Sequence, residues 1–308
     1  MLHTLLLISE QVAVLFLLML LGFFFGKKRM LDDATVRSLN AIILNVVIPC
    51  TVISGFQSDR AAGLVGDLLL CCLYSVLVLL LFFAVSALVT RKLPPDEQAV
   101  YGLSSSLTNC SFMGYPLETA LIGPLGIFYG SGFAAVMNLF TFTLGYLWFT
   151  RDRKSISIRF VLTRPAILSV LAAFALLLLR IRLPSLLLTA VNDLSSLCVP
   201  IPMLIIGYHL SRVDFRSVLR NRRHVLFTLF RLLVLPFLAL GLLLILGARG
   251  NVLAAVMIPS ACPVATVVTI LAGQFGDRET DAAELNAMQT ACSLLTIPPV
   301  MAIVSNFM

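Results

Sequence analysis

Two stretches of the chain, 104–116 and 259–269, place polar, glycine and proline residues inside runs that are otherwise apolar. Proline removes a backbone N–H donor and clashes with the turn before it, while serine, asparagine and glycine weaken a helix further. Each stretch therefore predicts a helix that breaks partway along its length. The residues concerned are Ser104, Ser105, Ser106, Thr108, Asn109, Ser111, Gly114, Pro116, Pro259, Ser260, Pro263, Thr266 and Thr269.

The chemistry that such breaks support is anion binding. Pro116 and Pro263 fit the first turn of a second half-helix, because a helix start does not need the missing N–H. The start of a half-helix presents free N–H groups and about half a positive charge. Two such starts close together predict a site for an anion, in particular a carboxylate. The alternative interpretation is that the prolines only kink the two helices for packing.

Other polar residues inside apolar runs are candidates for the same site. Asn138 and Gln289 occupy equivalent places, and they either line the site or bond between helices. Arg231 either neutralises a substrate carboxylate or pairs with carbonyls and extends toward the membrane surface. Glu118 and Asp193 either carry a coupling proton or lie solvated near the outer end of a helix.

The sequence contains no motif for catalysis or nucleotide binding, since HExxH, GxGxxG and Walker patterns are all missing. The three histidines have no metal-ligand spacing, and the seven cysteines include no CxxC pair. The sequence therefore predicts no enzyme, no metal and no cofactor. Transport on this chain would be driven by gradients and not by ATP.

The composition indicates a polytopic membrane protein. Of 308 residues, 59% are hydrophobic and 12% charged, about half the charged fraction of a soluble domain. This excludes a soluble enzyme, a disordered protein and a fibre. The net charge of +7 lies in short clusters between apolar runs, which is typical of topology signals and not of nucleic-acid binding. The expected surroundings are a lipid bilayer.

Apolar runs predict an all-α protein with ten membrane-spanning helices. Loops after the odd-numbered helices carry most lysines and arginines, so the positive-inside rule puts these loops in the cytoplasm and both termini outside. The even-numbered loops carry only Arg60, Arg180, Arg182 and Arg249. The predicted helices span about 4–25, 34–56, 67–90, 97–122, 125–150, 165–182, 185–210, 224–247, 251–274 and 281–306.

The two halves of the chain resemble each other at an offset of about 150 residues. Asn40 and Gly55 recur as Asn192 and Gly207, with prolines between them in both halves. Five helices per repeat is an odd number, so the second copy enters the membrane from the opposite side. This inverted repeat, 1–150 and 151–308, is typical of secondary transporters. Paired glycines recur as well, Gly123 and Gly126 as Gly273 and Gly276.

Several short segments match one known family in order and spacing. They are Leu39–Pro49, Asn109–Leu117, Gly123–Gly126, Met137-Asn138 with Thr143–Gly145, Arg231 with Pro236, and Pro259–Pro263 through Gly273–Gly276. In these segments the chain resembles the auxin efflux carrier family of permeases, in its bacterial branch.

The resemblance implies a transport domain of helices 3–5 and 8–10, in which the broken helices four and nine cross. Helices 1, 2, 6 and 7 would form a scaffold, often dimeric. Family substrates include the plant hormone auxin and small dicarboxylates such as malate or malonate. Two features differ from the plant pattern: the loop 151–164 is short, and Ser260–Pro263 lacks the asparagine that plant carriers place after the proline.

The predicted function is secondary transport of a small organic anion, in particular a carboxylate, by alternating access in a bacterial cytoplasmic membrane. The alternative is a membrane-embedded ligand sensor that uses the same pocket. A sodium–proton exchanger would need paired carboxylates at the break, and neither break contains them. The predicted substrate-binding residues are Asn109, Ser111, Gly114, Pro116, Asn138, Ser260, Pro263, Thr266 and Gln289, with Arg231, Glu118 and Asp193 in charge or coupling roles.

Overall fold

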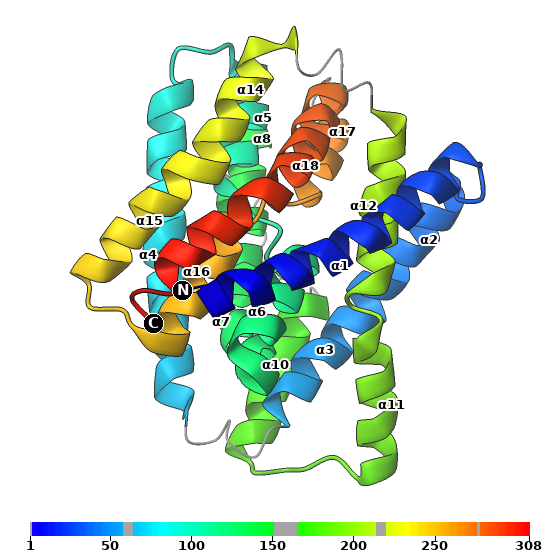
Figure 1. The fold of residues 1–308 in the computed structure, drawn as a ribbon, viewed down its shortest axis with the longest axis vertical. Helices are drawn as coiled ribbons and strands as arrows, with labels where there is room; N and C mark the ends of the chain where they lie inside the picture. The colour runs from blue at the N-terminus through cyan, green and yellow to red at the C-terminus, as the bar shows by residue number, and fades with distance from the viewer. Residues whose placement is uncertain (1, 58–63, 151–164, 214–219, 276–277) are drawn as a thin grey trace.

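The computed structural model describes residues 2–57, 64–150, 165–213, 220–275 and 278–308, which are helical with short connections and contain no strand (Figure 1). The loop 151–164 lies outside these residues. The helices are α1 (Leu2–Lys27), α2 (Asp33–Ile42), α3 (Ile48–Phe56), α4 (Val65–Thr90), α5 (Pro95–Ser106), α6 (Tyr115–Ile122), α7 (Gly126–Phe140), α8 (Tyr146–Thr150), α10 (Pro165–Leu178), α11 (Ser185–Ser196), α12 (Pro200–Arg212), α14 (Arg222–Leu229), α15 (Leu235–Ile245), α16 (Gly250–Ala261), α17 (Val267–Phe275) and α18 (Glu279–Val304).

Widened π-helical turns interrupt several of these helices. Three of them, at Ile43–Val47, Cys110–Gly114 and Phe230–Val234, each end two residues before a proline, namely Pro49, Pro116 and Pro236. The proline ring displaces the carbonyl one turn back and supplies no N–H, so the preceding turn widens. The first and third join α2 to α3 and α14 to α15, and a fourth at Thr141–Gly145 joins α7 to α8.

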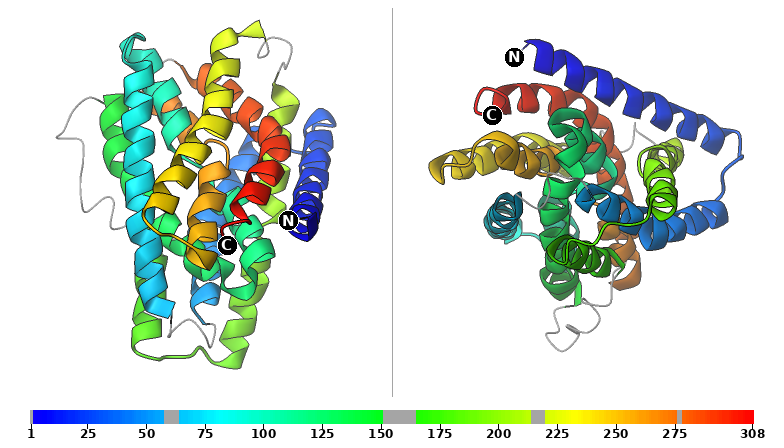
Figure 2. Two further views of the ribbon diagram at one scale, coloured as in Figure 1. Left: turned by 60° about the vertical axis from the view of Figure 1, so that its left-hand side comes forward. Right: turned by 90° about the horizontal axis from the view of Figure 1, so that it is seen from below.

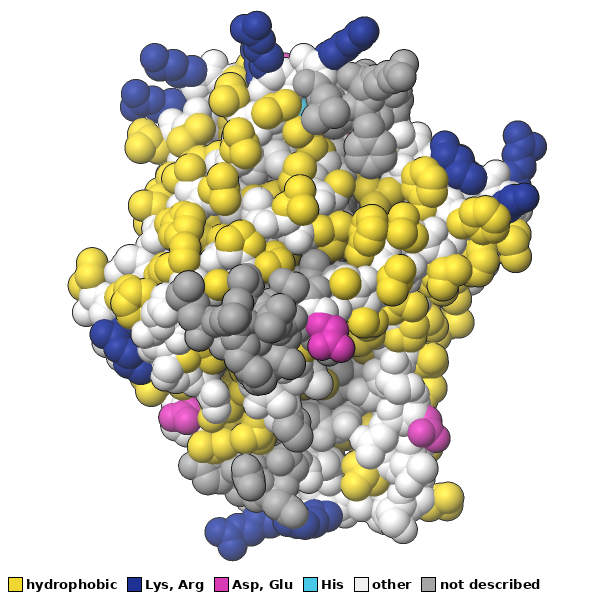
Figure 3. All heavy atoms as spheres, viewed as in Figure 1, with side chains coloured by type: hydrophobic (Ala, Val, Ile, Leu, Met, Phe, Trp, Pro, Cys, Tyr) yellow, Lys and Arg dark blue, Asp and Glu magenta, His cyan; other side chains and the backbone are white. Residues whose placement is uncertain are grey.

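The length and composition of the helices fit a membrane protein. Within the described residues, six helical segments are long and apolar enough to cross a bilayer. Large hydrophobic side chains such as Leu186, Ile245 and Leu295 are at least 80% exposed, and apolar surface extends over much of the face in Figure 3. A soluble monomer does not expose apolar surface on this scale. The six segments are Asp33–Phe56, Val65–Thr90, Gly126–Thr150, Ser185–Arg212, Arg222–Ile245 and Glu279–Val304.

Charged side chains gather at the ends of the molecule. The C-terminal ends of α4, α12 and α17 and the N-terminal ends of α5, α14 and α18 lie together at the upper end in Figure 1. Lys and Arg side chains cluster there and at the upper right in Figure 3, with a smaller group at the lower end. Ion pairs join these helix ends, because Arg278 binds Asp96 at 2.8 Å and Arg223 binds Glu97 at 2.5 Å.

Helix α1 lies at the edge of the molecule (Figure 2) and packs along α12 through backbone contact. A Cβ at Gly207 would come within 1.9 Å of the Met19 carbonyl oxygen, and one at Gly22 within 2.1 Å of the Leu204 carbonyl oxygen. Only glycine permits this approach. The glycine that recurs in the second half therefore sets the distance between these two helices.

Candidate functional site

Both predicted helix breaks are present in the structure. Helix α5 ends at Ser106, and helical structure resumes at Cys110 in the π turn that leads into α6. Helix α16 ends at Ala261, and α17 begins at Val267. Pro116 lies inside the second helical arm instead of at its start, and Pro263 lies within the unwound segment.

The two unwound segments pair with each other. Thr108 and Val264 form an antiparallel bridge. The Asn109 N–H donates to the Pro263 carbonyl at 2.8 Å. One step along, the Ala265 N–H donates to the Leu107 carbonyl at 3.2 Å. These hydrogen bonds therefore satisfy several of the backbone N–H and C=O groups that the two breaks expose. Inside a membrane such groups need a partner within the protein. We call this paired region, 107–109 with 262–266, the crossover.

Arg231 braces the crossover from behind. Its guanidinium is fully buried and donates to the Ser260 carbonyl at 3.0 Å and the Cys262 carbonyl at 2.7 Å. It also lies 5.2 Å from the Phe82 ring centroid. A cation at the C-terminal end of α16 satisfies carbonyls that the broken helix leaves open. This arrangement corresponds to the interpretation in which Arg231 pairs with backbone carbonyl groups.

Two further side chains hold the same region. The Gln289 Oε1 accepts a hydrogen bond from the Val264 N–H at 3.0 Å, and the Thr108 hydroxyl donates to the Pro259 carbonyl. Both side chains are buried. Gln289 therefore orders the unwound backbone and does not line the cavity described below.

The two polar atoms of the Asn109 side chain have different surroundings. Its Oδ1 caps the second arm of the broken helix by accepting from the Phe112 N–H at 3.3 Å. Its Nδ2 is buried and has no hydrogen-bond partner within the described part of the chain. An unpaired buried amide donor is costly, so a ligand at this position would recover that cost.

A cavity of about 190 Å³ opens beside the crossover. The starts of two helical arms, at Cys110 and Val267, lie in its wall, and its lining contains no acidic or basic side chain. Helix N-termini carry partial positive charge, so the wall favours an anion without a bound cation. The lining residues are Asn40, Leu44, Ile48, Thr108, Asn109, Cys110, Ser111, Phe112, Met137, Asn138, Thr141, Phe142, Ala265, Thr266, Val267 and Ile270.

The structure brings together four of the predicted binding residues and separates the others from the cavity. Asn109, Ser111, Asn138 and Thr266 line it. Pro116 lines a separate hollow against Tyr115 and Cys198. The residues outside the cavity wall, most of them in or beside the crossover, are Gly114, Pro116, Ser260, Pro263 and Gln289.

Three polar lining residues were not among the predicted binding residues: Asn40, Thr108 and Thr141. Asn40 had a signal in the sequence, because it is an amide within an apolar run and recurs as Asn192 in the second half. Thr141 carries no such signal, since threonine is common in membrane helices and its hydroxyl bonds the Met137 carbonyl.

The two acidic candidates lie in opposite environments. Glu118 on α6 is fully buried, and neither of its carboxyl oxygens has a hydrogen-bond partner among the described residues. It packs so closely on α7 that a Cβ at Gly130 would lie 1.7 Å from its Oε2. Asp193 on α11 is exposed. Burial of an unpaired carboxylate is very costly, so this environment favours the neutral carboxyl group over the carboxylate.

Comparison with known proteins identifies the family. The family model described as "Membrane transport protein" matches residues 7–160 and again residues 153–301. An uncharacterized transporter of Methanothermobacter thermautotrophicus is 24% identical over 300 residues, which cover 94% of this chain and 96% of the relative. An uncharacterized transporter of Methanocaldococcus jannaschii is 24% identical over 279 residues, covering 85% and 87%. The chain therefore belongs to the membrane transport protein family, the auxin efflux carrier family, and is an integral membrane protein of a transporter family.

Proposed function

We propose that the protein is a secondary transporter of a small organic anion, which binds through a carboxylate in the cavity beside the crossover. The observation that carries the proposal is the convergence of two helix starts, at Cys110 and Val267, on a cavity without charged side chains. The amides of Asn40, Asn109 and Asn138 add hydrogen-bonding capacity to the same wall.

The size of the cavity suits a small acid. A water molecule occupies about 30 Å³ in the liquid, so the cavity corresponds to roughly six waters. The half-positive charge at each helix start would replace part of the hydration that a carboxylate loses on entry. Hydroxyl groups of Ser111, Thr141 and Thr266 would bond the rest of the ligand.

We further propose that the chain is a ten-helix inverted repeat that works by alternating access. The two successive family matches, 7–160 and 153–301, support repeats at 1–150 and 151–308. Each half then contributes one broken element, α5 with α6 and α16 with α17. The distribution of lysine and arginine supports a topology in which both termini lie outside the cell. In this topology the end of the molecule at the top of Figure 1 lies in the cytoplasm.

The position of the cavity fits this mechanism. Asn40 belongs to the proposed scaffold of α1–α3 and α10–α12, whereas Asn109, Asn138 and Thr266 belong to the proposed transport domain. The ligand would therefore bind between the two parts. Movement of one part against the other would expose the bound anion first on one side and then on the other.

Transport in liposomes tests the proposal. Purified protein would be reconstituted, and uptake of labelled mono- and dicarboxylic acids would be measured against their amides under imposed proton and sodium gradients. We expect saturable uptake of at least one acid and at least tenfold lower uptake of its amide. Binding of an acid without uptake or exchange would instead indicate a sensor. Equal handling of acid and amide would contradict an anion site.

We assign the coupling proton to Glu118, as part of this proposal. A buried carboxyl group without a partner is stable only when protonated, and it would release its proton on exposure to water in another conformation. Glu118 lies on α6, in the helical arm that begins at Cys110 in the cavity wall. A movement of this arm would therefore affect both Glu118 and the binding site. Asp193 is exposed in this conformation and does not share this property.

A further inference from the structure

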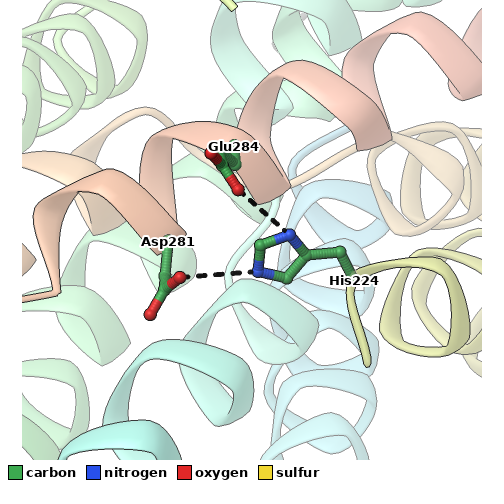
Figure 4. Close-up of side chains that lie close together, drawn as sticks. All are labelled: His224, Asp281 and Glu284. Carbon is green, nitrogen blue, oxygen red and sulfur yellow. Dashed lines mark ion pairs between the residues drawn. The ribbon is translucent and has the colours of Figure 1, made fainter. Parts of the chain in front are cut away.

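A histidine lies between two carboxylates (Figure 4), at the end of the molecule where α14 and α18 begin (Figure 1), and none of the three residues lines the cavity. His224 stands in the first turn of α14, and Asp281 and Glu284 stand in the first two turns of α18. The His224 Nδ1 lies 3.3 Å from Glu284 Oε2, and the Nε2 lies 3.7 Å from Asp281 Oδ1. The imidazole is fully buried, yet neither nitrogen makes a hydrogen bond within the described residues.

The shorter of these two distances fits two ligand atoms of one metal ion. In a tetrahedral site with bonds of about 2.0 Å to nitrogen and oxygen, neighbouring ligand atoms are about 3.3 Å apart. The His224 Nδ1 and the Glu284 Oε2 have this separation. A histidine that binds a metal through one nitrogen almost always donates its other N–H to a carboxylate. Asp281 stands on that side of the ring, and one ligand atom from each of the three residues lies within 4.8 Å of the others.

Ion pairs surround these three residues at this end of the molecule. Four carboxylates, two on α5 and two on α18, meet two guanidiniums and the imidazole at this end of the molecule. The guanidiniums are already engaged, because Arg223 binds Glu97, and Arg278 binds Asp96, Glu97 and Asp281. The carboxylates are Asp96, Glu97, Asp281 and Glu284.

An ion can reach this position from the aqueous side. The side chains of Asp281 and Glu284 are 24% and 26% exposed, whereas His224 is buried beneath them and lies 5.8 Å from the Tyr101 ring centroid. One face of the site is therefore open to solvent and the other is closed by protein. This arrangement leaves room for water to complete the coordination.

We propose that His224 and Glu284 bind a divalent transition-metal ion such as Zn²⁺, with Asp281 orienting the imidazole through its Nε2–H. Imidazole and carboxylate ligands suit first-row transition metals. The ion ties the N-terminal end of α14 to that of α18, and so stabilises one end of the proposed transport domain. This site is independent of the transported substrate and does not require that the proposed function be correct.

Zinc titration of the purified protein tests the site. Calorimetry on the whole chain in detergent would count zinc equivalents, and the seven free cysteines make variants necessary for the assignment. We expect H224A and E284Q each to lose one equivalent, or to weaken it more than tenfold, while D281N weakens it about 10- to 100-fold. H209A is the matched control, because His209 is exposed on α12.

Two further measurements make the outcome decisive. Co²⁺ bound at this site would show visible d–d bands without the near-ultraviolet thiolate band that cysteine ligands produce. Zinc would raise the melting temperature of the wild type and of H209A but not of E284Q, which keeps the shape of the side chain. The proposal is overturned if the wild type binds no more zinc than H224A and E284Q, with all three proteins folded.

Discussion

The backbone N–H of Asn109 donates to the carbonyl of Pro263 across the crossover, at 2.8 Å. This bond connects two segments that are over 150 residues apart in the chain and places the amide of Asn109 at the cavity wall. The proline contributes in two ways, because it interrupts the helix and its carbonyl then accepts the bond. The position of the proposed binding amide thus depends on both breaks together.

Asn109→Asp should abolish anion transport without unfolding the protein. Aspartate keeps a side-chain oxygen to cap the Phe112 N–H, but it removes the Nδ2 donor and adds a negative charge to the cavity. We expect at least a hundredfold lower uptake from protein that is still folded in detergent, with a lower melting temperature because the new carboxylate is buried. Asn306→Asp is the control, because Asn306 is an exposed amide beyond the end of α18 and outside the cavity, and this variant should transport normally. Normal uptake by N109D would move the site elsewhere.

Arg231→Met should destabilise the protein strongly. It leaves the carbonyls of Ser260 and Cys262 without their buried donors, at a cost on the order of 3–5 kcal/mol. Arg231→Lys can keep one of the two bonds and should lose less. Thermal unfolding in detergent measures the difference, and Arg249→Gln at an exposed position should be close to wild type. A stable R231M protein would show that the brace is dispensable.

Gly207→Ala should separate α1 from α12. The new Cβ would meet the Met19 carbonyl at 1.9 Å, so the helices must move apart, at a cost of about 1–3 kcal/mol. Gly241→Ala is the matched control on α15, because no atom lies within 4 Å of a Cβ there and alanine favours the helix. Melting temperatures should fall for G207A and stay level or rise for G241A. The opposite order would contradict the backbone contact.

Glu118→Gln should uncouple transport from the proton gradient while preserving exchange. Glutamine imitates the neutral carboxyl group in shape and cannot release a proton. We expect substrate counterflow near the wild-type rate and at least tenfold weaker accumulation under an imposed proton gradient. Asp193→Asn, at the exposed position on α11, should leave both unchanged. If E118Q accumulates substrate like the wild type, the proton is carried elsewhere, and the anion site is unaffected by that result.

Single cysteines in a cysteine-free variant should report the proposed topology. Lys92→Cys lies after α4 among the loops assigned to the cytoplasm, and Asn306→Cys lies beyond α18 on the assigned outside. In right-side-out vesicles, an impermeant maleimide should label the second position and reach the first only after permeabilisation. Equal labelling of both positions in intact vesicles would refute the assignment.

Properties that depend on neighbouring residues in the chain can be predicted from the sequence. The apolar runs predicted an all-α membrane protein with ten spanning helices; the described residues are helical, and six of their segments are long and apolar enough to cross a bilayer. The prolines and polar residues near 104–116 and 259–269 predicted two broken helices, because a missing N–H acts within one turn of the chain. Both breaks are present, at 107–109 and 262–266.

Which polar side chains face the cavity depends on tertiary packing and cannot be predicted from the sequence. Gln289 and Arg231 could line a site or brace one, and packing against α16 directs both to crossover backbone groups. Asn40 lines the cavity because the fold brings α2 to the same cavity as the helix starts at Cys110 and Val267. Helix periodicity gives a residue's place around its own axis, but the neighbour on that side depends on contacts between distant segments.

The same reason explains why no sequence pattern indicates the proposed metal site. His224 has no ligand spacing in the chain, since its two carboxylates lie 57 and 60 residues later. Asp281 and Glu284 share one face of α18 by their spacing of three, but a helical sequence does not specify which helix will cover that face. The packing of the α14 start against the α18 start brings the three side chains together.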